Sequence, residues 1–129
     1  MAQNNVELAR RGVASVHDFW GMLDEYVVWD LRAWPLPDLD HVYVGRDAVV
    51  KASRHYWGTW DEYHVEAEEI IEAGPSVVVI LHERGIGKGS GAPFEKRHPQ
   101  LWTFRKGRII RWESLPTRAE AVEAAGLSE

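Results

Sequence analysis

The sequence predicts an α+β domain in which helices pack against one side of a curved antiparallel sheet. The first observation behind this class is the order of the periodic segments: helix, helix, strand, helix, then four consecutive strands and a closing helix. The second is the face composition of the last three strands, where polar side chains alternate with aromatic ones. Such a mixture indicates a sheet curled round a pocket that meets a small ligand.

Length and composition are those of one domain, which we place at residues 1–129. The chain has 129 residues, of which 45% are hydrophobic and 27% are charged, within the ordinary range for a single domain. Seven Trp, four Tyr and three Phe residues suit a core or an apolar cavity wall. Because no apolar run approaches about 18 residues and the first residues lack a signal-peptide core, we expect a cytoplasmic protein with no membrane partner.

Charge and cysteine content exclude several classes of protein. The net charge is −5 and the basic residues are scattered, so we expect no nucleic-acid partner. The chain has no cysteine, which excludes disulfides, thiolate chemistry and Cys-ligated zinc. Neither a two-His-one-carboxylate spacing nor a helical HxxxH pattern is present, so we expect no metal and no other cofactor.

The first half of the chain predicts three helices and one strand. Apolar residues at helical spacing predict a first helix capped by Asn5 and a short second helix over about Asp18–Asp24. The stretch Tyr26–Arg32 is rich in strand-forming residues. The segment Ala33–Val44 holds two prolines and predicts an irregular loop that serves as a lid or site wall. Gly45–Asp61 then returns to the helical period.

The second half predicts four strands. Tyr63–Ala73 reads as a strand that ends at a Gly-Pro turn, and three more strands follow at Ser76–Lys88, Ala92–Phe104 and Arg108–Leu115. Tight glycine turns join these last three strands. We therefore expect them to pair as consecutive hairpins.

A closing helix is predicted over Thr117–Ala125. Thr117 precedes Glu120 by three residues, which is the spacing of a capping box. Gly126 follows the last periodic residue and is expected to end the helix.

The register of the hairpins decides which side chains share the pocket. We centre the first turn on residue 89 or 90 and pair Phe104 with Arg108, so that even-numbered residues lie opposite even-numbered ones. The pocket face would then hold Val78, Ile80, His82, Arg84, His98, Gln100, Trp102, Phe104, Ile110, Trp112 and Ser114. The opposite face would carry Glu83 and the apolar residues Val77, Val79, Leu81 and Leu101. We interpret this second, outer face as the surface of a homodimer.

Asp30 is the first catalytic candidate. It ends a strand that we expect to face the aromatic cavity, where desolvation would raise the pKa of its carboxyl toward that of a useful base. The alternative is a solvated strand-end residue, or one paired with Arg32 or Arg84. His82 and His98 are candidate proton shuttles, with the alternative that both are cavity-lining histidines satisfied by their neighbours.

The ligand-binding candidates are aromatic and polar residues of the predicted pocket. Arg84 would hold an anionic group, unless it forms a rim salt bridge with Glu83 or Glu95. The other candidates are Trp34, Tyr43, Tyr56, Trp57, Trp60, Trp102, Trp112 and Ser114. The aromatic members belong either to the pocket wall or to the core. We expect a hydrophobic or aromatic small molecule as the partner of this pocket.

Several segments, in their order along the chain, resemble the SnoaL-like branch of the nuclear transport factor 2-like superfamily. They are YVVWDL, YVGRDAV, ERGIGKGSG, QLWTFRKGRIIRW and TRAEAVEAAGL. The resemblance covers nearly the whole chain. It implies a cone: a strongly curved antiparallel or mixed sheet wrapped round three helices from the N-terminal half, with a short C-terminal helix and a cavity at one end. Members include polyketide cyclases, ketosteroid isomerases and proteins without catalytic activity, so fold alone does not give function.

The resemblance carries over only in part. Asp30 lies where the ketosteroid isomerases place their general base, and Gln100 lies near their oxyanion-stabilising acid. The segment Arg11-Gly12-Val13 lacks their helix tyrosine, and Ser114 stands near the acid/base aspartate of the cyclases. The resemblance implies a small-molecule-binding protein, with Asp30 as base on a cyclic or aromatic ketone and with Gln100 and a histidine stabilising the oxyanion. The alternative is a non-catalytic binding or accessory domain.

Overall fold

The computed structural model describes residues 4–36 and 38–127. Within them, four helices and five strands follow the predicted order, and a sixth, short strand lies in the segment expected to be a loop. Their bounds are α1 Asn5–Ala14, α2 Val16–Met22, β1 Leu23–Asp30, β2 Val42–Val44, α3 Arg46–Gly58, β3 Trp60–Ala73, β4 Ser76–Gly87, β5 Pro93–Arg105, β6 Arg108–Ser114 and α4 Arg118–Ala124.

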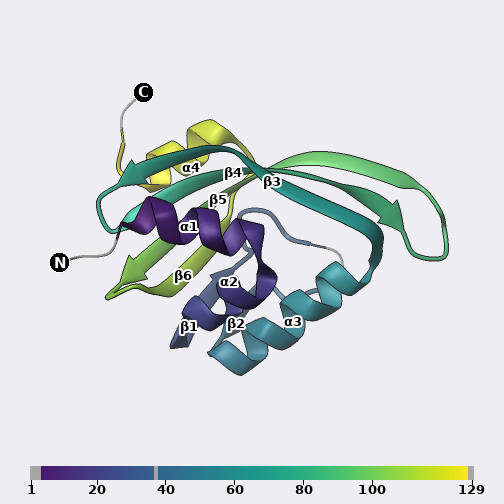
Figure 1. Ribbon diagram of the computed structural model, residues 1–129, viewed down its shortest axis with the longest axis horizontal. Helices are drawn as coiled ribbons and strands as arrows, with labels where there is room; N and C mark the ends of the chain where they lie inside the picture. The colour runs from purple at the N-terminus through teal and green to yellow at the C-terminus, as the bar shows by residue number, and fades with distance from the viewer. Residues whose placement is uncertain (1–3, 37, 128–129) are drawn as a thin grey trace.

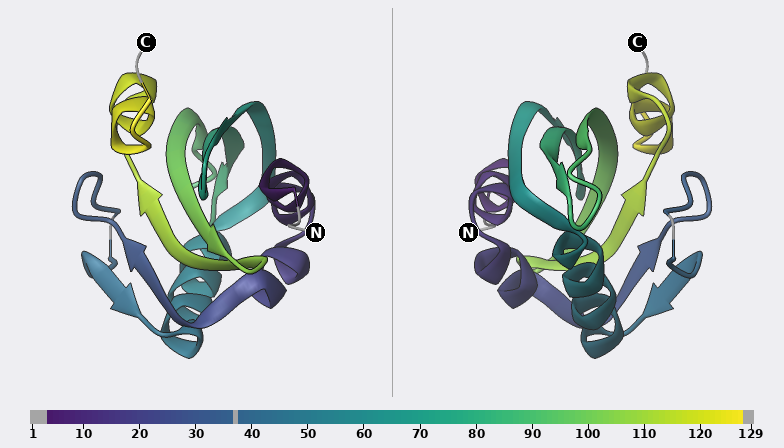
Figure 2. Two further views of the ribbon diagram at one scale, coloured as in Figure 1. Left: turned by 90° about the vertical axis from the view of Figure 1, so that its left-hand side faces the viewer. Right: turned by 90° about the vertical axis from the view of Figure 1, so that its right-hand side faces the viewer.

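All six strands form one mixed sheet in the order β2-β1-β6-β5-β4-β3 (Figure 1). The pair β1–β6 is parallel, and the other four pairs are antiparallel. The strands curve strongly (Figure 2). Irregularities in the pairing of β3 with β4 fall between Asp61 and His64 and between Ala67 and Glu69. Such bulges increase local bending and twist, which lets the sheet wrap round its contents.

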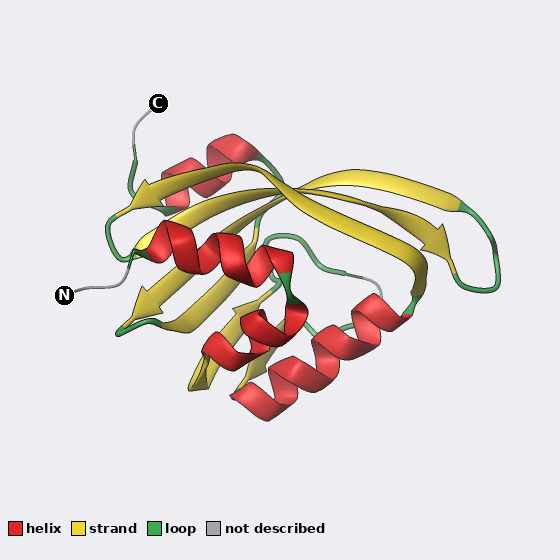
Figure 3. Cartoon of the chain, viewed as in Figure 1, coloured by secondary structure: helices red, strands yellow, loops and turns green. Residues whose placement is uncertain are grey.

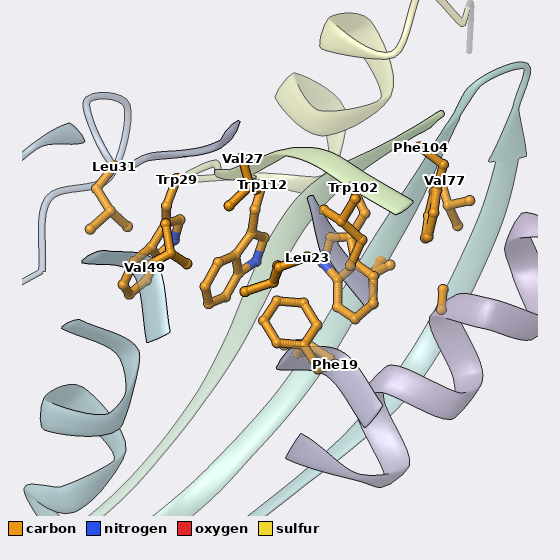
Figure 4. Close-up of a cluster of buried hydrophobic side chains, with 14 of the residues drawn as sticks. Phe19, Leu23, Val27, Trp29, Leu31, Val49, Val77, Trp102, Phe104 and Trp112 are labelled. Atoms are coloured by element: carbon orange, nitrogen blue, oxygen red, sulfur yellow. The ribbon is translucent and has the colours of Figure 1, made fainter. Parts of the chain in front are cut away.

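Helices α1, α2 and α3 lie on the concave face of the sheet, and α4 lies on its convex face (Figure 3). The inner core joins these three helices to side chains of β1, β4, β5 and β6. Figure 4 shows Trp29, Trp112 and Trp102 in a row, and Phe19 packs against Trp102 and Trp112. The predicted α+β cone with three enclosed helices and a short C-terminal helix is confirmed.

Local capping explains where the helices begin. The side chain of Asn4, rather than the predicted Asn5, accepts hydrogen bonds from the first turn of α1. Ser15 caps α2, so this helix begins at Val16, two residues earlier than predicted, and leaves Leu23 to start β1. The predicted cap at Thr117 is confirmed, because its Oγ1 accepts from the backbone N–H of Glu120 at 3.1 Å.

The predicted register of the hairpin β4–β5 is wrong. Ile86 pairs with Pro93 and Val79 pairs with Gln100, so even-numbered residues lie opposite odd-numbered ones. The reason is that the turn is centred between Gly89 and Ser90 rather than on either residue. A displacement of half a residue in the turn exchanges the two faces of one strand relative to the other.

This register also corrects the predicted dimer surface. Val77, Val79 and Leu81 are buried in the inner core beside Trp102, while Leu101 lies on the convex face. There Leu101 packs with Ala121 of α4 and with three further residues, Val78, Ile80 and Leu115. The apolar part of the outer face is thus covered by helix α4 of the same chain.

The second hairpin keeps the predicted parity only in part. Gln100 pairs with Ser114 and Trp102 with Trp112, as expected. A register shift after Thr103 then pairs Phe104 with Ile109 instead of Arg108.

Among the described residues, none of the helices has the length and apolar character that crossing a membrane requires.

Candidate functional site

A cavity of about 320 Å³ opens between the concave face of the sheet and the three enclosed helices. Its volume lies at the lower end of the range for small-molecule sites. Helices α1–α3 contribute Gly12, Val13, Ala14, Val16, Phe19, Trp20, Arg54, Tyr56 and Trp57. The strands and the loop after β1 contribute Trp29, Leu36, Tyr63, Val65, Leu81, Glu83, His98, Gln100, Trp102 and Trp112.

Aromatic rings build a large part of the wall. Trp29 and Trp112 stack at 4.2 Å between ring centroids, and Phe19 meets Trp102 and Trp112 at 4.9 and 4.7 Å. Such packed rings hold one another in place and present a stiff apolar surface to a ligand. Leu36 of the loop after β1, the segment predicted to serve as a lid or site wall, also lines the cavity.

The polar groups gather at the buried end of the cavity around Glu83 and His98. Each side chain is 2% exposed, and His98 Nδ1 lies 3.2 Å from Glu83 Oε2. On its other side, His98 Nε2 lies 2.8 Å from the hydroxyl of Ser114. The three side chains form a continuous hydrogen-bonded chain from β4 through β5 to β6.

Two further groups hold the Glu83 carboxylate. The Tyr63 hydroxyl donates to Glu83 Oε1 at 2.5 Å, and Lys96 Nζ lies 3.6 Å from Oε2 while donating to the Tyr56 hydroxyl at 2.8 Å. Burial by itself would raise the pKa of Glu83, but the hydrogen bonds and charges of these partners and His98 hold it below its ordinary value. Glu83 is therefore an ionised carboxylate inside an apolar cavity at neutral pH.

The ionised carboxylate sets the tautomer of His98. An ionised carboxylate only accepts hydrogen bonds, so His98 Nδ1 carries a proton and donates it to Glu83. In the neutral ring Nε2 is then the acceptor, and Ser114 donates its hydroxyl proton to it. Burial raises the pKa of the Tyr56 and Tyr63 phenols, so both stay protonated.

Gln100 is oriented by two indoles. Its Oε1 accepts from Trp102 Nε1 at 2.8 Å and from Trp112 Nε1 at 3.0 Å. An indole nitrogen only donates, so the atom that faces both indoles must be the amide oxygen. In the described part of the chain no side chain or backbone group accepts from the amide nitrogen of Gln100. The amide is therefore a preoriented donor on the cavity wall.

Three lining residues are exposed and mark the mouth of the cavity. They are Ala14 and Val16, where α1 gives way to α2, and Arg54 on α3. The guanidinium of Arg54 lies 5.2 Å from the ring centroid of Trp20. The indole N–H of Trp20 in turn donates to the buried hydroxyl of Ser53 at 3.0 Å.

Asp30 lies outside this cavity, contrary to the prediction. Trp29 faces the cavity, so Asp30, the next residue on the strand, points to the other side of the sheet. Its carboxylate accepts from Arg32 Nε at 3.0 Å and Nη2 at 2.8 Å, and also from Arg111. The hydrogen bonds from Arg32, together with the charge of Arg111, lower the pKa of Asp30 despite its burial. This places Asp30 in the ion pair that the sequence offered as the alternative.

His82 and Arg84 also lie away from the cavity, because the register of β4 turns them to the convex face. His82 bonds Glu95 at 2.6 Å and approaches Glu66 at 3.5 Å. Arg84 pairs across the strands with His64 and Glu95 and is exposed. Glu83, assigned to the opposite face by the predicted register, is the β4 residue that enters the polar end.

Of the remaining candidates, Tyr56, Trp57, Trp102 and Trp112 line the cavity together with His98 and Gln100. The other four lie behind the wall. Trp34 meets the ring of His98 edge-on at 4.5 Å, Tyr43 packs on Trp29, Trp60 packs on Phe94, and Ser114 supports His98. They contact the lining residues without lining the cavity themselves.

Sequence reasoning missed Glu83, Tyr63 and Arg54 as site residues. Glu83 comes two residues after a run of six apolar or small residues, Ser76–Leu81, in β4, and a buried carboxylate in such a strand requires a partner. That pattern could have indicated Glu83 as a site residue, whereas no comparable sequence pattern marks Tyr63 or Arg54. In residues 4–36 and 38–127, no cluster of three or more His, Cys, Asp or Glu side chains is arranged as a metal site.

The fold is shared with solved structures of low sequence identity. One is a nuclear transport factor 2-like protein of unknown function from Burkholderia pseudomallei, with 22% identity, 94% of this chain and 96% of that chain covered, and a TM-score of 0.74. A second is a putative SnoaL-like polyketide cyclase from Jannaschia sp. CCS1, with 18% identity, coverage of 94% and 90%, and a TM-score of 0.73.

A third similar structure is a protein with a ketosteroid isomerase-like fold from Catenulispora acidiphila, solved in complex with trimethylamine. It has 15% identity, coverage of 99% and 96%, and a TM-score of 0.70. No curated protein matches the sequence. The family model described as "SnoaL-like domain" matches residues 16–112, which is more than half of the chain. The chain therefore belongs to the SnoaL-like domain family.

Proposed function

We propose that this protein binds a small cyclic or aromatic ketone in the cavity between α1–α3 and the sheet. The observation that carries the proposal is the amide of Gln100, whose oxygen is occupied by two indoles and whose nitrogen is left to donate. A ketone oxygen is a matching acceptor, and the stacked tryptophans provide an apolar surface for a ring. Small-molecule sites combine these features: an apolar wall and a few placed polar groups.

Binding is tested by titrating the protein with 2-acetylnaphthalene and following tryptophan fluorescence. The matched control ligand is 2-ethylnaphthalene, which has the same ring system and no acceptor oxygen. We expect saturable binding of both, with the ketone bound about tenfold more tightly through one hydrogen bond in a dry site. The absence of saturable binding for both ligands would contradict the proposal.

The variant Gln100→Glu isolates the amide donor. At pH 8 its carboxylate still accepts from Trp102 and Trp112 but has no proton to give to a ketone. We expect this variant to bind 2-ethylnaphthalene as the wild type does and to lose the preference for 2-acetylnaphthalene. A preserved ketone preference would show that Gln100 does not hold the oxygen.

A second candidate function is acid–base catalysis on the bound ketone, and a specific contact favours it. Glu83 lines the cavity as an ionised carboxylate backed by His98. Glu83 and Gln100 both line the cavity, so for a ketone bound between them the carboxylate would remove a proton α to the carbonyl while the amide stabilises the enolate oxygen. In this proposal Glu83 replaces Asp30 as the base, and the similar structure named a polyketide cyclase is consistent with such chemistry.

Catalysis is distinguished from binding alone by proton exchange. The methyl protons of 2-acetylnaphthalene would exchange with deuterium in D2O, which NMR follows directly. We expect exchange above the buffer rate in the wild type and a loss of about 100-fold or more in Glu83→Gln, the usual contribution of a positioned base. Binding with no exchange above buffer would leave the accessory-domain alternative in place.

Homodimerisation through the convex face of the sheet stays a prediction. The part of that face not covered by α4 carries charged pairs, among them Arg97 with Glu68 at 2.7 Å. Light scattering at micromolar concentration measures the mass, and a monomeric value would remove the prediction.

A further inference from the structure

We propose that the ligand also carries a carboxylate, which Arg54 binds at the mouth of the cavity. This inference rests on the proposed function, because it describes the outer end of the ligand whose ketone end meets Gln100. The expected ligand is an aromatic or alicyclic keto acid whose carboxylate lies on the far side of the ring system from the ketone.

Arg54 is placed for this role by a chain of contacts from the core. Ser53 is fully buried and donates to the backbone oxygen of Val50 at 3.1 Å, which fixes the hydroxyl that receives the Trp20 indole at 3.0 Å. The guanidinium of Arg54 rests over that indole at 5.2 Å. An arginine so supported loses less rotamer freedom when it binds an anion than a free surface arginine does.

The guanidinium of Arg54 has no acidic partner in the described ranges. Several other arginines are paired, as in Arg32 with Asp30, Arg97 with Glu68 and Arg111 with Glu113. No ion pair or hydrogen bond of Arg54 occurs within residues 4–36 and 38–127. Its five N–H donors are open to a ligand carboxylate, which a guanidinium binds in bidentate geometry.

The charges along the cavity give the ligand a direction. The buried end holds the ionised carboxylate of Glu83, and Lys96 offsets only part of that charge because its Nζ lies 3.6 Å from Oε2, beyond hydrogen-bond distance, and its side chain is partly exposed. An anionic group at this end would meet a like charge in a medium of low dielectric constant. The mouth carries the positive charge of Arg54. A keto acid therefore enters with its ketone first and leaves its carboxylate at Arg54.

The experiment compares 6-acetyl-2-naphthoate with 2-acetylnaphthalene, two probes that differ only in the carboxylate. Affinities are measured by tryptophan fluorescence for the wild type, for Arg54→Gln and for Lys51→Gln. Lys51 is an exposed residue of the same helix that does not line the cavity, so its variant removes the same charge from α3 without touching the site.

We expect the wild type to bind the carboxylate probe about tenfold more tightly than the neutral probe, as a partly exposed charge-assisted bond allows. Arg54→Gln is expected to abolish this preference, and Lys51→Gln to keep it. Equal affinity for the two probes in the wild type, or a preference that survives in Arg54→Gln, would overturn the inference while leaving the proposed function intact. Failure of both probes to bind would overturn both proposals.

Discussion

Glu83 Oε2 lies 3.2 Å from Nδ1 of His98, and the two side chains join strands β4 and β5 at the buried end of the cavity. Both are 2% exposed, so bulk water cannot replace a lost hydrogen-bond partner of the Glu83 carboxylate or of the His98 ring. Tyr63 and Lys96 complete the shell of Glu83. This one carboxylate consequently holds the polar end of the cavity together.

We expect Glu83→Gln to lower the free energy of unfolding by about 2–4 kcal/mol at pH 7, because it leaves the partners of a buried charge with a weaker acceptor. The wild-type contribution has a defined pH range. The pKa of Glu83 is lowered on folding, so its stabilisation is present above the unfolded pKa of about 4.3 and is lost as pH falls through the folded pKa.

Urea denaturation between pH 3 and pH 7 measures this effect. The variant is expected to show a flatter pH dependence than the wild type over that range. The control is Glu72→Gln on the exposed edge strand β3, which should match the wild type within about 0.5 kcal/mol. An unchanged acid slope in Glu83→Gln would refute the assignment of Glu83 as an ionised group.

The neutral form of His98 is expected to be the Nδ1–H tautomer. The reason is the pair of partners: an ionised carboxylate at Nδ1 and a hydroxyl donor at Nε2. Nitrogen-15 NMR of the imidazole rings reports which nitrogen bears the proton. Ser114→Ala should keep this tautomer and cost about 1–2 kcal/mol of stability through the unpaired Nε2, whereas an Nε2–H signal in the wild type would contradict the network.

Asp30→Asn is expected to destabilise the protein without affecting the cavity. Asp30 accepts from Arg32 and Arg111 on the far side of the sheet, and we expect a loss of about 1–2 kcal/mol because Arg32 is largely exposed. The affinity for 2-acetylnaphthalene should stay within twofold of the wild-type value. A loss of binding or of proton exchange in a folded Asp30→Asn protein would restore Asp30 as a site residue.

Gly12→Ala and Gly21→Ala are expected to have opposite effects on stability. A Cβ at Gly12 would lie 2.9 Å from Trp102 Cζ3 and 3.0 Å from Met22 Cε, whereas a Cβ at Gly21 would meet no heavy atom within 4 Å. The first change should cost about 1–3 kcal/mol through overpacking, and the second should gain about 0.5–1 kcal/mol through helix propensity. Thermal unfolding followed by circular dichroism measures both. Equal effects would show that α1 does not press on the cavity wall at Gly12.

Much of the fold follows from local patterns in the sequence. The strand Ser76–Gly87 ends within one residue of its prediction, and Thr117 caps the last helix as its capping-box spacing predicts. Such features depend on residues close together in the chain. The short strand Val42–Val44 was missed because three residues give too little periodicity, and its pairing with β1 is what defines it.

The candidate site was predictable where neighbouring strands kept their parity. Gln100, Trp102 and Trp112 share a face as expected, because the β5–β6 hairpin keeps its parity up to Thr103. The prediction placed His82 in the pocket and Glu83 on the opposite face, and the structure shows the reverse. The cause is the register of the β4–β5 hairpin, which differs from the predicted one.

The amino-acid order alone determined the class of fold, the succession of elements and the abundance of aromatic side chains available for a cavity. Only the tertiary structure decided which carboxylate enters that cavity. The reason is geometric, because adjacent residues of a strand point to opposite faces. The centre of the β4–β5 turn lies between Gly89 and Ser90, and this half-residue difference from the predicted centre places Glu83 on the inner face and His82 on the outer face. The pairing of Asp30 with Arg111 likewise joins strands that are distant in the chain and adjacent in the sheet.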